Sequence, residues 1–399
     1  MKILVINCGS SSLKYQLFDM ENEQSLAVGI CEAIGTDVSR KRGKTHDGSS
    51  FYEYTDIPNH LSAFNEVKDS LTTGECKIIN DLSEIDAIGH RGVLGGRIFD
   101  DSVLVTDEVA KAIETLIPLA PIHTPVHLEA IDACTKLFGK DVPQVAVFDN
   151  AFHKGMPETS YMFALPYKYY EEENIRRYGA HGSSHRFVAQ RTAEILEKDL
   201  TEFKLITCHL GAGASIAAIK YGDVLDTSMG FTPVDGIMMG TRCGSVDPSA
   251  ITYIMQKHNY TPEEMDNIMN TKSGLLGISG LHSDYREILN SAKEGNKRAK
   301  LAIEMQEYQI TKCIGSYIAA MNGVDAITFT GGIGENSEVL RTNVLKHFTH
   351  LGVKIDETAD NSDKKEFEVT SPDCPVRAFV IPTNEELSIA RETLRIISQ

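Results

Sequence analysis

Three glycine-rich segments could bring backbone N–H groups close to a phosphate. The first runs from Asn7 to Lys14 (NCGSSSLK), and the others are residues 209–213 (HLGAG) and 331–336 (GGIGEN). Glycine permits the close backbone approach that phosphate binding needs, and a lysine adds a point charge. Taken alone, the first segment could equally be an ordinary turn. Three such segments in one chain, each after an apolar run, indicate nucleotide binding.

The first segment differs from a Walker phosphate loop. A Walker loop has a second glycine followed by Lys-Ser or Lys-Thr, and it then opens a helix. Here Leu13, Tyr15 and Leu17 alternate with polar residues, which predicts a β-strand. We therefore expect a hairpin that offers N–H groups and hydroxyls to phosphate, and a P-loop NTPase is disfavoured.

Charged side chains follow further apolar runs. Arg91 comes just after one such run, Asp149 follows residues 145–148, and Arg242 lies in a glycine-rich loop. Ligands of open α/β sheets lie beyond the carboxyl ends of the strands, so these side chains could converge on one cleft. The planar guanidinium of arginine suits both carboxylate and phosphoryl oxygens. Each arginine could also be a solvated residue paired with a surface carboxylate.

Two histidine pairs have i, i+4 spacing, His123 with His127 and His181 with His185. A zinc helix of the His-Glu-x-x-His type needs a glutamate after the first histidine and an uninterrupted helix. Neither pair has this glutamate, and proline or glycine interrupts each segment. We therefore do not expect these pairs to bind a metal. His181, which precedes a glycine, is better suited to donate a hydrogen bond to a phosphate.

Short apolar runs alternate with helical patterns along the chain, which is typical of sheets covered by helices. The apolar run at 2–6 and the alternating run at 13–17 flank a turn, and the runs at 204–208 and 215–219 flank a glycine-rich turn in the same way. This repeat predicts an internally duplicated α/β protein with two related domains, although a repeat so short could be coincidental.

Helix signals and a change of composition complete the predicted organisation. An aromatic and proline-rich stretch at 151–170 predicts a domain crossing near residue 150. The C-terminal helix is expected to follow a capping box that begins at Thr383. Other helices are predicted at residues 183–198, with Ser183 or Ser184 as the cap, and at 301–321 and 337–345.

The composition narrows the class of protein. The 399 residues include 39 Lys and Arg against 56 Asp and Glu, a formal net charge of −17. A field of this sign repels nucleic acid and anionic lipid, so neither is expected as a partner. No apolar run approaches the roughly 18 residues of a membrane span, and the cysteines are scattered without a Cys-x-x-Cys pair. These features predict a cytoplasmic protein whose anionic ligands are held by local cations.

Taken together, the motifs resemble those of the acetate kinase family, in the superfamily of acetate and sugar kinases, Hsp70 and actin. They run from Asn7 to the segment 383–386 (TNEE) and include 118–121 (PLAP), 239–242 (MGTR) and 273–279 (SGLLGIS). The resemblance implies a duplicated, two-domain actin-like (ribonuclease H-like) α/β fold with the active site in the interdomain cleft. By this resemblance, residues 1–150 with 385–399 would form one domain, and residues 151–384 the nucleotide-binding domain.

The resemblance also implies a reaction. The chain would transfer the γ-phosphoryl group of ATP directly and reversibly to acetate, giving acetyl phosphate and ADP, with Mg²⁺ or Mn²⁺, and it would form a homodimer. A carboxylate is already ionised at neutral pH, so no general base is needed to create the nucleophile. Positioning and charge stabilisation should therefore carry the catalysis.

Individual roles follow from the same resemblance. Arg91 and Arg242 would bind the carboxylate and the transferring phosphoryl group, and His181 would donate a hydrogen bond to that group. Asn7 and Glu385 would organise Mg²⁺, with Asp149 orienting substrate or metal. The acyl pocket would comprise Val93, Ile122, Ala180 and Pro233, with Arg91. The nucleotide site would comprise Ser10, Ser12, Lys14, His209, Leu210, Gly211, Ala212, Gly213, Asp284, Tyr285, Arg286, Gly332, Ile333, Gly334, Glu335 and Asn336.

Several positions depart from the family pattern. Ala180 stands where a phenylalanine usually forms one wall of the acetate methyl pocket, which predicts a larger pocket. A kinase for propionate or another short-chain carboxylate is therefore the first alternative. A sugar kinase and a non-enzymatic nucleotide-binding protein like actin or Hsp70 are the others. Other departures include Leu94 and Arg97 in place of His and Glu, Asn150 in place of Thr, and Ala212 in place of Asn.

Overall fold

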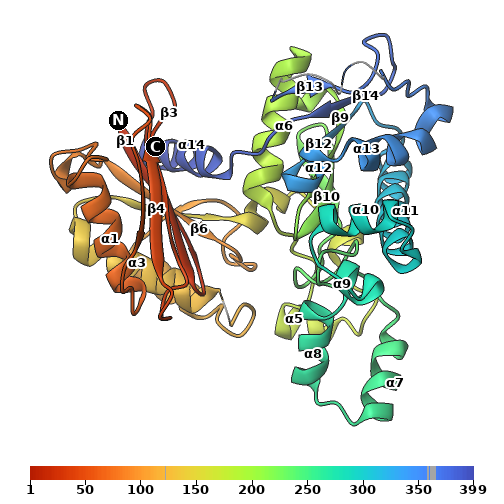
Figure 1. The fold of residues 1–399 in the computed structure, drawn as a ribbon, viewed down its shortest axis with the longest axis horizontal. Helices are drawn as coiled ribbons and strands as arrows, with labels where there is room; N and C mark the ends of the chain where they lie inside the picture. Colours follow the sequence, from red (N-terminus) through yellow and green to blue (C-terminus); the bar gives the residue numbers. More distant parts are fainter. Residues whose placement is uncertain (122, 357–358, 360–364) are drawn as a thin grey trace. The chain divides into compact units, whose positions relative to one another are not determined.

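The computed structural model describes residues 1–121, 123–356, 359 and 365–399, which divide into two compact units (Figure 1). Unit 1 comprises Met1–Phe152 and Asn384–Gln399, and unit 2 comprises His153–Thr383. Each unit contains one mixed β-sheet with helices against it. Both chain termini therefore belong to unit 1.

The sheet of unit 1 has the strand order β5-β4-β3-β2-β1-β6-β8-β7. β1 (Lys2–Gly9) and β2 (Ser12–Asp19) are antiparallel, and Gly9 lies opposite Ser12, so the predicted hairpin is confirmed. β6 (Ala87–Gly92) runs parallel to β1 and to β8 (Gln144–Phe148). The other strands are β3 (Gln24–Glu32), β4 (Arg40–Thr45), β5 (Ser50–Tyr54) and β7 (Val103–Leu104).

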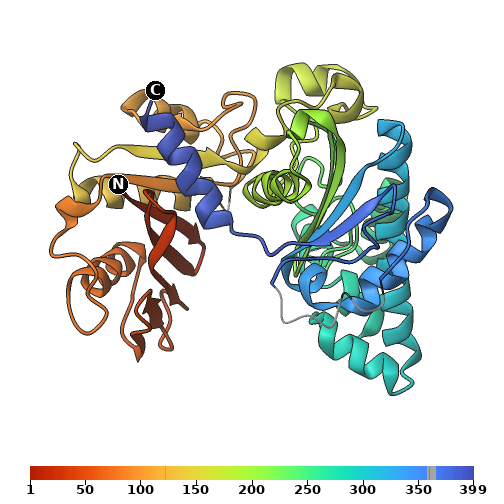
Figure 2. The same ribbon diagram turned by 90° about the horizontal axis from the view of Figure 1, so that it is seen from above.

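Helices cover both faces of this sheet (Figure 2). Helices α1 (His60–Thr72) and α3 (Thr124–Phe138) share a core with the side chains of β1 and β2. On the other face, Gly89 lets α14 (Glu385–Ile397) lie close, because a Cβ there would be 2.8 Å from Cγ2 of Ile389. Asn384, not Thr383, caps α14 by accepting a hydrogen bond from the Leu387 N–H, so the predicted cap was wrong by one residue. Unit 1 also contains α2 (Asp107–Glu114).

The sheet of unit 2 repeats the central topology of the first, which is the predicted duplication. Its strand order is β11-β10-β9-β12-β14-β13. β9 (Lys204–Leu210) is antiparallel to β10 (Ala214–Lys220) and parallel to β12 (Ala326–Thr330), which is parallel to β14 (Arg377–Val380). These relations match those of β1 with β2, β6 and β8. The remaining strands are β11 (Asp223–Thr227) and β13 (Phe367–Glu368).

Figure 1 shows α6 (Gly182–Leu196) and α11 (Lys297–Met321) on opposite sides of this second sheet. Both helices confirm predictions, although α6 begins at Gly182 with His181 before it, and neither predicted serine is its cap. The segment 331–336 is itself a helix, α12 (Gly331–Asn336), where a turn was expected, and α13 (Glu338–Leu345) follows with Ser337 as its cap. Other helices are α4 (Glu158–Tyr161), α5 (Lys168–Glu173), α7 (Pro248–His258), α8 (Pro262–Thr271), α9 (Gly274–Ser279) and α10 (Tyr285–Lys293).

No helix in the described part of the chain combines the length and the apolar character that crossing a bilayer requires. Short 3₁₀ helices connect several of the larger elements, and one of them begins directly after β8 with a predicted site residue, Asp149. Those with bounds in the described part of the chain are Leu82–Glu84, Asp149–His153, Leu200–Glu202 and Lys346–Leu351.

Of the first predicted histidine pair, His127 is part of the core of unit 1, whereas His123 is exposed. His127 lies on α3, buried, with its ring 6.1 Å from the ring of His90 and 6.0 Å from that of Phe148. His90 is also buried, and its Nε2 lies 2.7 Å from Oε1 of Gln144. Burial lowers the pKa of His127 to about 3 and the pKa of His90 to about 4. Both rings are therefore neutral at pH 7.

These buried histidines should make the protein acid-sensitive. Their folded-state pKa values lie below the unfolded value of about 6.5. Below that pH, the unfolded chain therefore binds protons that these histidines do not bind in the folded state. Stability present above pH 6.5 is thus lost as the pH falls toward 4, by about 1.4 kcal/mol per pH unit for each histidine. In urea unfolding at pH 7, 6 and 5, His127→Leu should show a shallower pH slope than the wild type. Equal slopes would contradict this account.

Candidate functional site

In unit 1, the structure brings two predicted residues, Asp149 and Glu385, against a third, Arg91. Arg91 lies inside β6 near its carboxyl end, where the sequence had placed it just beyond the strand. Its Nη2 is 2.9 Å from Oδ2 of Asp149, and its Nη1 is 3.5 Å from Oε2 of Glu385. Asp149 is only 1% exposed. Burial opposes the charge of Arg91, but the two carboxylates raise its pKa above the ordinary value. The guanidinium is therefore a fixed cation.

The hairpin carries the other predicted residues of unit 1. Asn7 on β1 lies directly opposite Lys14 on β2, and Ser10 is in the turn that connects them, with Ser12 at the start of β2. Lys14 is exposed and forms no ion pair within the described residues. A lysine in this state can meet an anionic ligand without first breaking an internal contact.

The segment after β6 holds the first acyl-pocket residue. Val93 follows the strand and is half-buried, whereas Ile122 lies outside the described residues. Asn150, one of the departures from the family pattern, ties this segment to the end of β8. Its Oδ1 accepts from the Gly95 N–H at 2.6 Å, and its Nδ2 donates to the Gly96 carbonyl at 3.2 Å. The side-chain amide of Asn150 therefore has a structural role, which is to hold the segment at Gly95 and Gly96.

In unit 2, His181 and Arg242 meet at the glycine turn between β9 and β10. A Cβ at Gly213 would lie 3.2 Å from Nη1 of Arg242 and 3.4 Å from Nε2 of His181. His181 precedes α6 with φ of 57°, in the left-handed region that disfavours residues other than glycine. Such backbone strain is concentrated at functional sites. The absent side chain at position 213 thus lets two polar groups approach one turn.

Arg242 is a half-buried cation without a carboxylate partner within the described residues. Its Nη1 lies 3.5 Å from the carbonyl oxygen of Pro233 and 3.7 Å from Sδ of Met239. Burial lowers its pKa below the ordinary value. Arg91 has two carboxylate partners, whereas the positive charge of Arg242 is not balanced by a nearby carboxylate in the described residues. An anionic ligand would balance it.

Ala180 and Pro233 flank these polar groups from two segments. Ala180 precedes His181 and is buried, 6% exposed, within the apolar core of unit 2. Pro233 is half-buried and presents its carbonyl to Arg242. The structure thus brings the predicted apolar residues of unit 2 next to the predicted polar ones.

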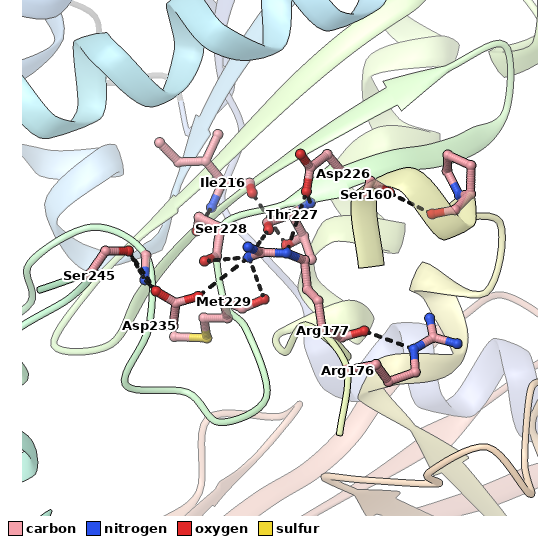
Figure 3. Close-up of polar contacts among 12 residues, drawn as sticks. Ser160, Arg176, Arg177, Ile216, Asp226, Thr227, Ser228, Met229, Asp235 and Ser245 are labelled. Atoms are coloured by element: carbon pink, nitrogen blue, oxygen red, sulfur yellow. Dashed lines mark hydrogen bonds and ion pairs between the residues drawn. The ribbon is translucent and has the colours of Figure 1, made fainter. Parts of the chain in front are cut away.

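Arg177 holds these two segments together, and no sequence motif pointed to this residue (Figure 3). Its Nη1 donates to the carbonyl oxygens of Thr227, Ser228 and Met229 at 2.8, 3.1 and 3.3 Å. Its guanidinium also lies 3.7 Å from Asp226 and 3.6 Å from Asp235. The chain before His181 is thereby fixed to the chain that leads to Pro233. No motif predicts this contact, because the partners are about fifty residues away.

Replacing Arg177 with glutamine should destabilise unit 2. The change would leave two partly exposed carboxylates without their cation and three carbonyls without a donor, and losing hydrogen bonds from a charged donor costs about 1.5 to 3 kcal/mol. Urea unfolding at pH 7 measures this loss. Arg40→Gln, which removes a partly exposed arginine paired with Glu32, is the matched control and should cost less than about 1 kcal/mol. Equal losses of unfolding free energy in the two variants would show that the contacts of Arg177 have no special role in stability.

The predicted nucleotide segments line one cavity of about 650 Å³ in unit 2. The predicted segments are the turn after β9, the start of α10, and helix α12, and the start of α13 completes the lining. The sequence missed lining residues on α10 and α13, although Leu289 and Lys293 share a helix face with Tyr285 at i+4 and i+8. The predicted lining residues are Gly211, Ala212, Asp284, Tyr285, Arg286, Gly332, Ile333 and Asn336, and the missed ones are Ser283, Leu289, Lys293, Ser337, Glu338 and Val339.

Eight predicted nucleotide residues do not line this cavity: Ser10, Ser12 and Lys14 belong to unit 1, and the other five lie in unit 2. Leu210 and Gly334 are buried, and the carboxylate of Glu335 accepts a hydrogen bond from the Gly331 N–H at 2.9 Å, closing the start of α12. His209 stacks on His181 with ring centroids 4.3 Å apart, and Gly213 lies at the same turn. His209 and Gly213 therefore belong to the polar cluster around His181.

The similarity to known proteins extends over the whole chain. Residues 2–391 match the family model of the acetokinase family. A curated relative, the acetate kinase of Halothermothrix orenii, is 51% identical over 397 residues, covering 100% of both chains. The crystal structure of Porphyromonas gingivalis acetate kinase has 43% identity and a TM-score of 0.95 over 99% of each chain. A propionate kinase from Francisella tularensis subsp. tularensis SCHU S4 has 41% identity and a TM-score of 0.91 over 99% of each chain.

Proposed function

Because the chain belongs to the acetokinase family, whose members are phosphotransferases with a carboxyl group as acceptor, we propose that it transfers the γ-phosphoryl group of ATP reversibly to acetate. The products are acetyl phosphate and ADP. The observation that carries this proposal is Arg242, a half-buried cation without a carboxylate partner in the described residues, beside His181 at Gly213. A transferring phosphoryl group supplies the anion that this cluster lacks.

The reaction needs positioning and charge stabilisation more than acid-base chemistry. An oxygen of the ionised carboxylate attacks the γ-phosphorus, the bond to the β-phosphate oxygen breaks, and ADP leaves with the electron pair. Arg242 and His181 would stabilise the charge on the equatorial oxygens. Arg91 would hold the acetate carboxylate, and Asp149 fixes the orientation of Arg91. The 650 Å³ cavity would hold the nucleoside of ATP.

Mg²⁺, or Mn²⁺ in its place, would be held by residues of unit 1. Mg²⁺ prefers oxygen ligands and is usually bound by one or two carboxylates together with substrate phosphates. Asn7 and Glu385 would hold it, since Glu385 keeps its carboxylate 17% exposed and oriented by Arg91. Within the described residues, no three His, Cys, Asp or Glu side chains form a metal cage, so nucleotide phosphates would complete the set of ligands. When bound there, Mg²⁺ would neutralise charge on those phosphates.

A hydroxylamine trapping assay with Mg-ATP and acetate tests the proposal. Hydroxylamine converts an acyl phosphate into a hydroxamate, whereas a sugar phosphate gives none. Hydroxamate should form in proportion to ADP and should require acetate. ADP formation with a sugar but no hydroxamate would establish a sugar kinase. Tight Mg-ATP binding without turnover on any short carboxylate would favour the non-enzymatic alternative.

Family membership also leads us to propose a cytoplasmic homodimer. Sedimentation of the purified protein tests the oligomeric state.

A second candidate acceptor is propionate, which Ala180 favours because a small side chain replaces the usual phenyl wall. Ala180→Phe should lower kcat/KM for propionate relative to acetate by roughly 10- to 100-fold, the range for one methylene in an apolar pocket. The ratio of the two kcat/KM values measures this effect. Ala180→Leu is the variant to use if the larger ring disrupts the fold, because position 180 is buried. An unchanged ratio in a folded variant would disprove this view of the pocket.

A further inference from the structure

A continuous chain of hydrogen bonds runs from the core of unit 2 to His181. Nδ1 of His181 is 2.9 Å from Oγ of Ser215, and Nε2 of His185 is 2.7 Å from the same hydroxyl. Nδ1 of His185 is 2.7 Å from Oγ1 of Thr207. Thr207, His185 and Ser215 are each 0% exposed. His181 directly precedes α6, His185 lies in its first turn, and the neighbouring strands β9 and β10 supply Thr207 and Ser215.

Hydrogen-bond accounting gives this chain one direction. If Thr207 donates to Nδ1 of His185, then Nε2–H of His185 donates to Ser215, and the Ser215 hydroxyl donates to Nδ1 of His181. Every group in the chain is then satisfied. In the opposite direction the proton of the Thr207 hydroxyl would need an acceptor, and the described residues provide none besides His185. Buried polar groups are rarely left unpaired, so the first direction prevails.

We propose that Thr207, His185 and Ser215 are positioning residues that fix the tautomer of His181, with Nδ1 as acceptor and the proton on Nε2. The proposal rests on the proposed role of His181 toward the phosphoryl group. Nε2 is the nitrogen that approaches the turn at Gly213 beside Arg242. With its proton there, His181 presents a donor to an anion, whereas the other tautomer would present a lone pair.

Two further observations agree with this arrangement. Burial, with His153 and His209 nearby, lowers the pKa of His185 well below its ordinary value, so this ring is neutral and has the one donor and one acceptor that the chain requires. The ring of His209 stacks on His181 at 4.3 Å, and its Nδ1 lies 2.7 Å from the hydroxyl of Ser184. The stacking restrains the plane of the His181 ring while the chain determines its proton.

Thr207→Val tests the direction of the chain without touching His181. The variant removes the hydroxyl that distinguishes the two directions, so both tautomers of His181 should become populated. Thr328→Val is a matched control, because Thr328 lies opposite Thr207 on β12 and is also 0% exposed. Its hydroxyl forms a hydrogen bond with that of Thr192, which is not a member of the hydrogen-bond chain to His181. Nitrogen-15 shifts of His181 in the full-length protein report the tautomer directly. The wild type and Thr328→Val should show protonated Nε2, and Thr207→Val an averaged signal.

Kinetics supply the second measurement. Thr207→Val should lower kcat severalfold, and Ser215→Ala, which removes the donor to Nδ1, roughly tenfold, with KM for acetate and ATP within about twofold. Protonated Nδ1 in the wild type, or an unchanged His181 signal and kcat in folded Thr207→Val and Ser215→Ala, would overturn the proposal. If wild-type protein formed no acyl phosphate, the proposed function would fail, whereas the nitrogen shifts would still decide the direction of the chain.

Discussion

Arg242→Gln is expected to lower kcat by roughly 10³-fold or more, the range for an arginine that stabilises a transferring phosphoryl group. The stability of this variant, in contrast, should not decrease. Arg242 is half-buried, burial lowers its pKa, and no carboxylate partner offsets its charge within the described residues. Removing such a charge relieves a desolvation cost. The free energy of unfolding should therefore stay the same or increase while turnover is lost.

The hydroxamate assay and urea unfolding together measure this prediction. Arg242→Lys should be intermediate in turnover, because it keeps the charge but loses the planar fork that matches phosphoryl oxygens. Lys300→Gln, at a side chain 69% exposed on α11, is the control and should change neither quantity. A drop in kcat of less than tenfold in Arg242→Gln would remove Arg242 from the proposed mechanism.

Arg91→Gln should reduce kcat/KM by roughly 10²- to 10³-fold, the range for losing one preorganised charged donor. Unlike Arg242, it should also cost stability. Asp149 is 1% exposed and lies 2.9 Å from Arg91, so the variant leaves a buried carboxylate without its cation. Breaking a buried pair in this way costs about 3 to 5 kcal/mol. The two arginines therefore predict different pairs of outcomes.

A double-variant cycle with Asp149→Asn separates the two roles of Arg91. If Asp149 acts mainly by holding Arg91, the losses in unfolding free energy should be strongly non-additive, because each single change already breaks the same pair. Lys136→Gln, which removes an exposed pair with Asp132 on α3, is the control in the same unit. An Arg91→Gln variant with full stability and low activity would show that the pair with Asp149 contributes little to folding.

The net charge of −17 makes the few local cations decisive. The chain as a whole repels ATP and acetate, so binding depends on positive groups held at the site. Arg91 is held by two carboxylates, and Arg242 and Lys14 lack an acidic partner within the described residues. Neutralising an arginine at the site should therefore matter far more than neutralising an exposed lysine.

Much of the architecture was predictable because it depends on local signals. The alternation at Leu13, Tyr15 and Leu17 specified the hairpin, and the repeat of that pattern at β9 and β10 specified the duplication. Helix ends were less predictable, since several polar residues near a terminus compete for the cap. Asn384 takes the role expected of Thr383, and the glycines at 331–336 form a helical turn.

The sequence by itself determined the alternating α/β pattern, the family and the identity of the candidate polar groups, because residue types and their spacing encode these directly. Only the tertiary structure decided which groups have partners. Arg91 meets Asp149 and Glu385 across distances of 58 and 294 residues in the chain, and Thr207, Ser215 and His185 form one hydrogen-bonded chain to His181. Such pairings arise from strand register and helix packing between distant segments, which no local pattern specifies.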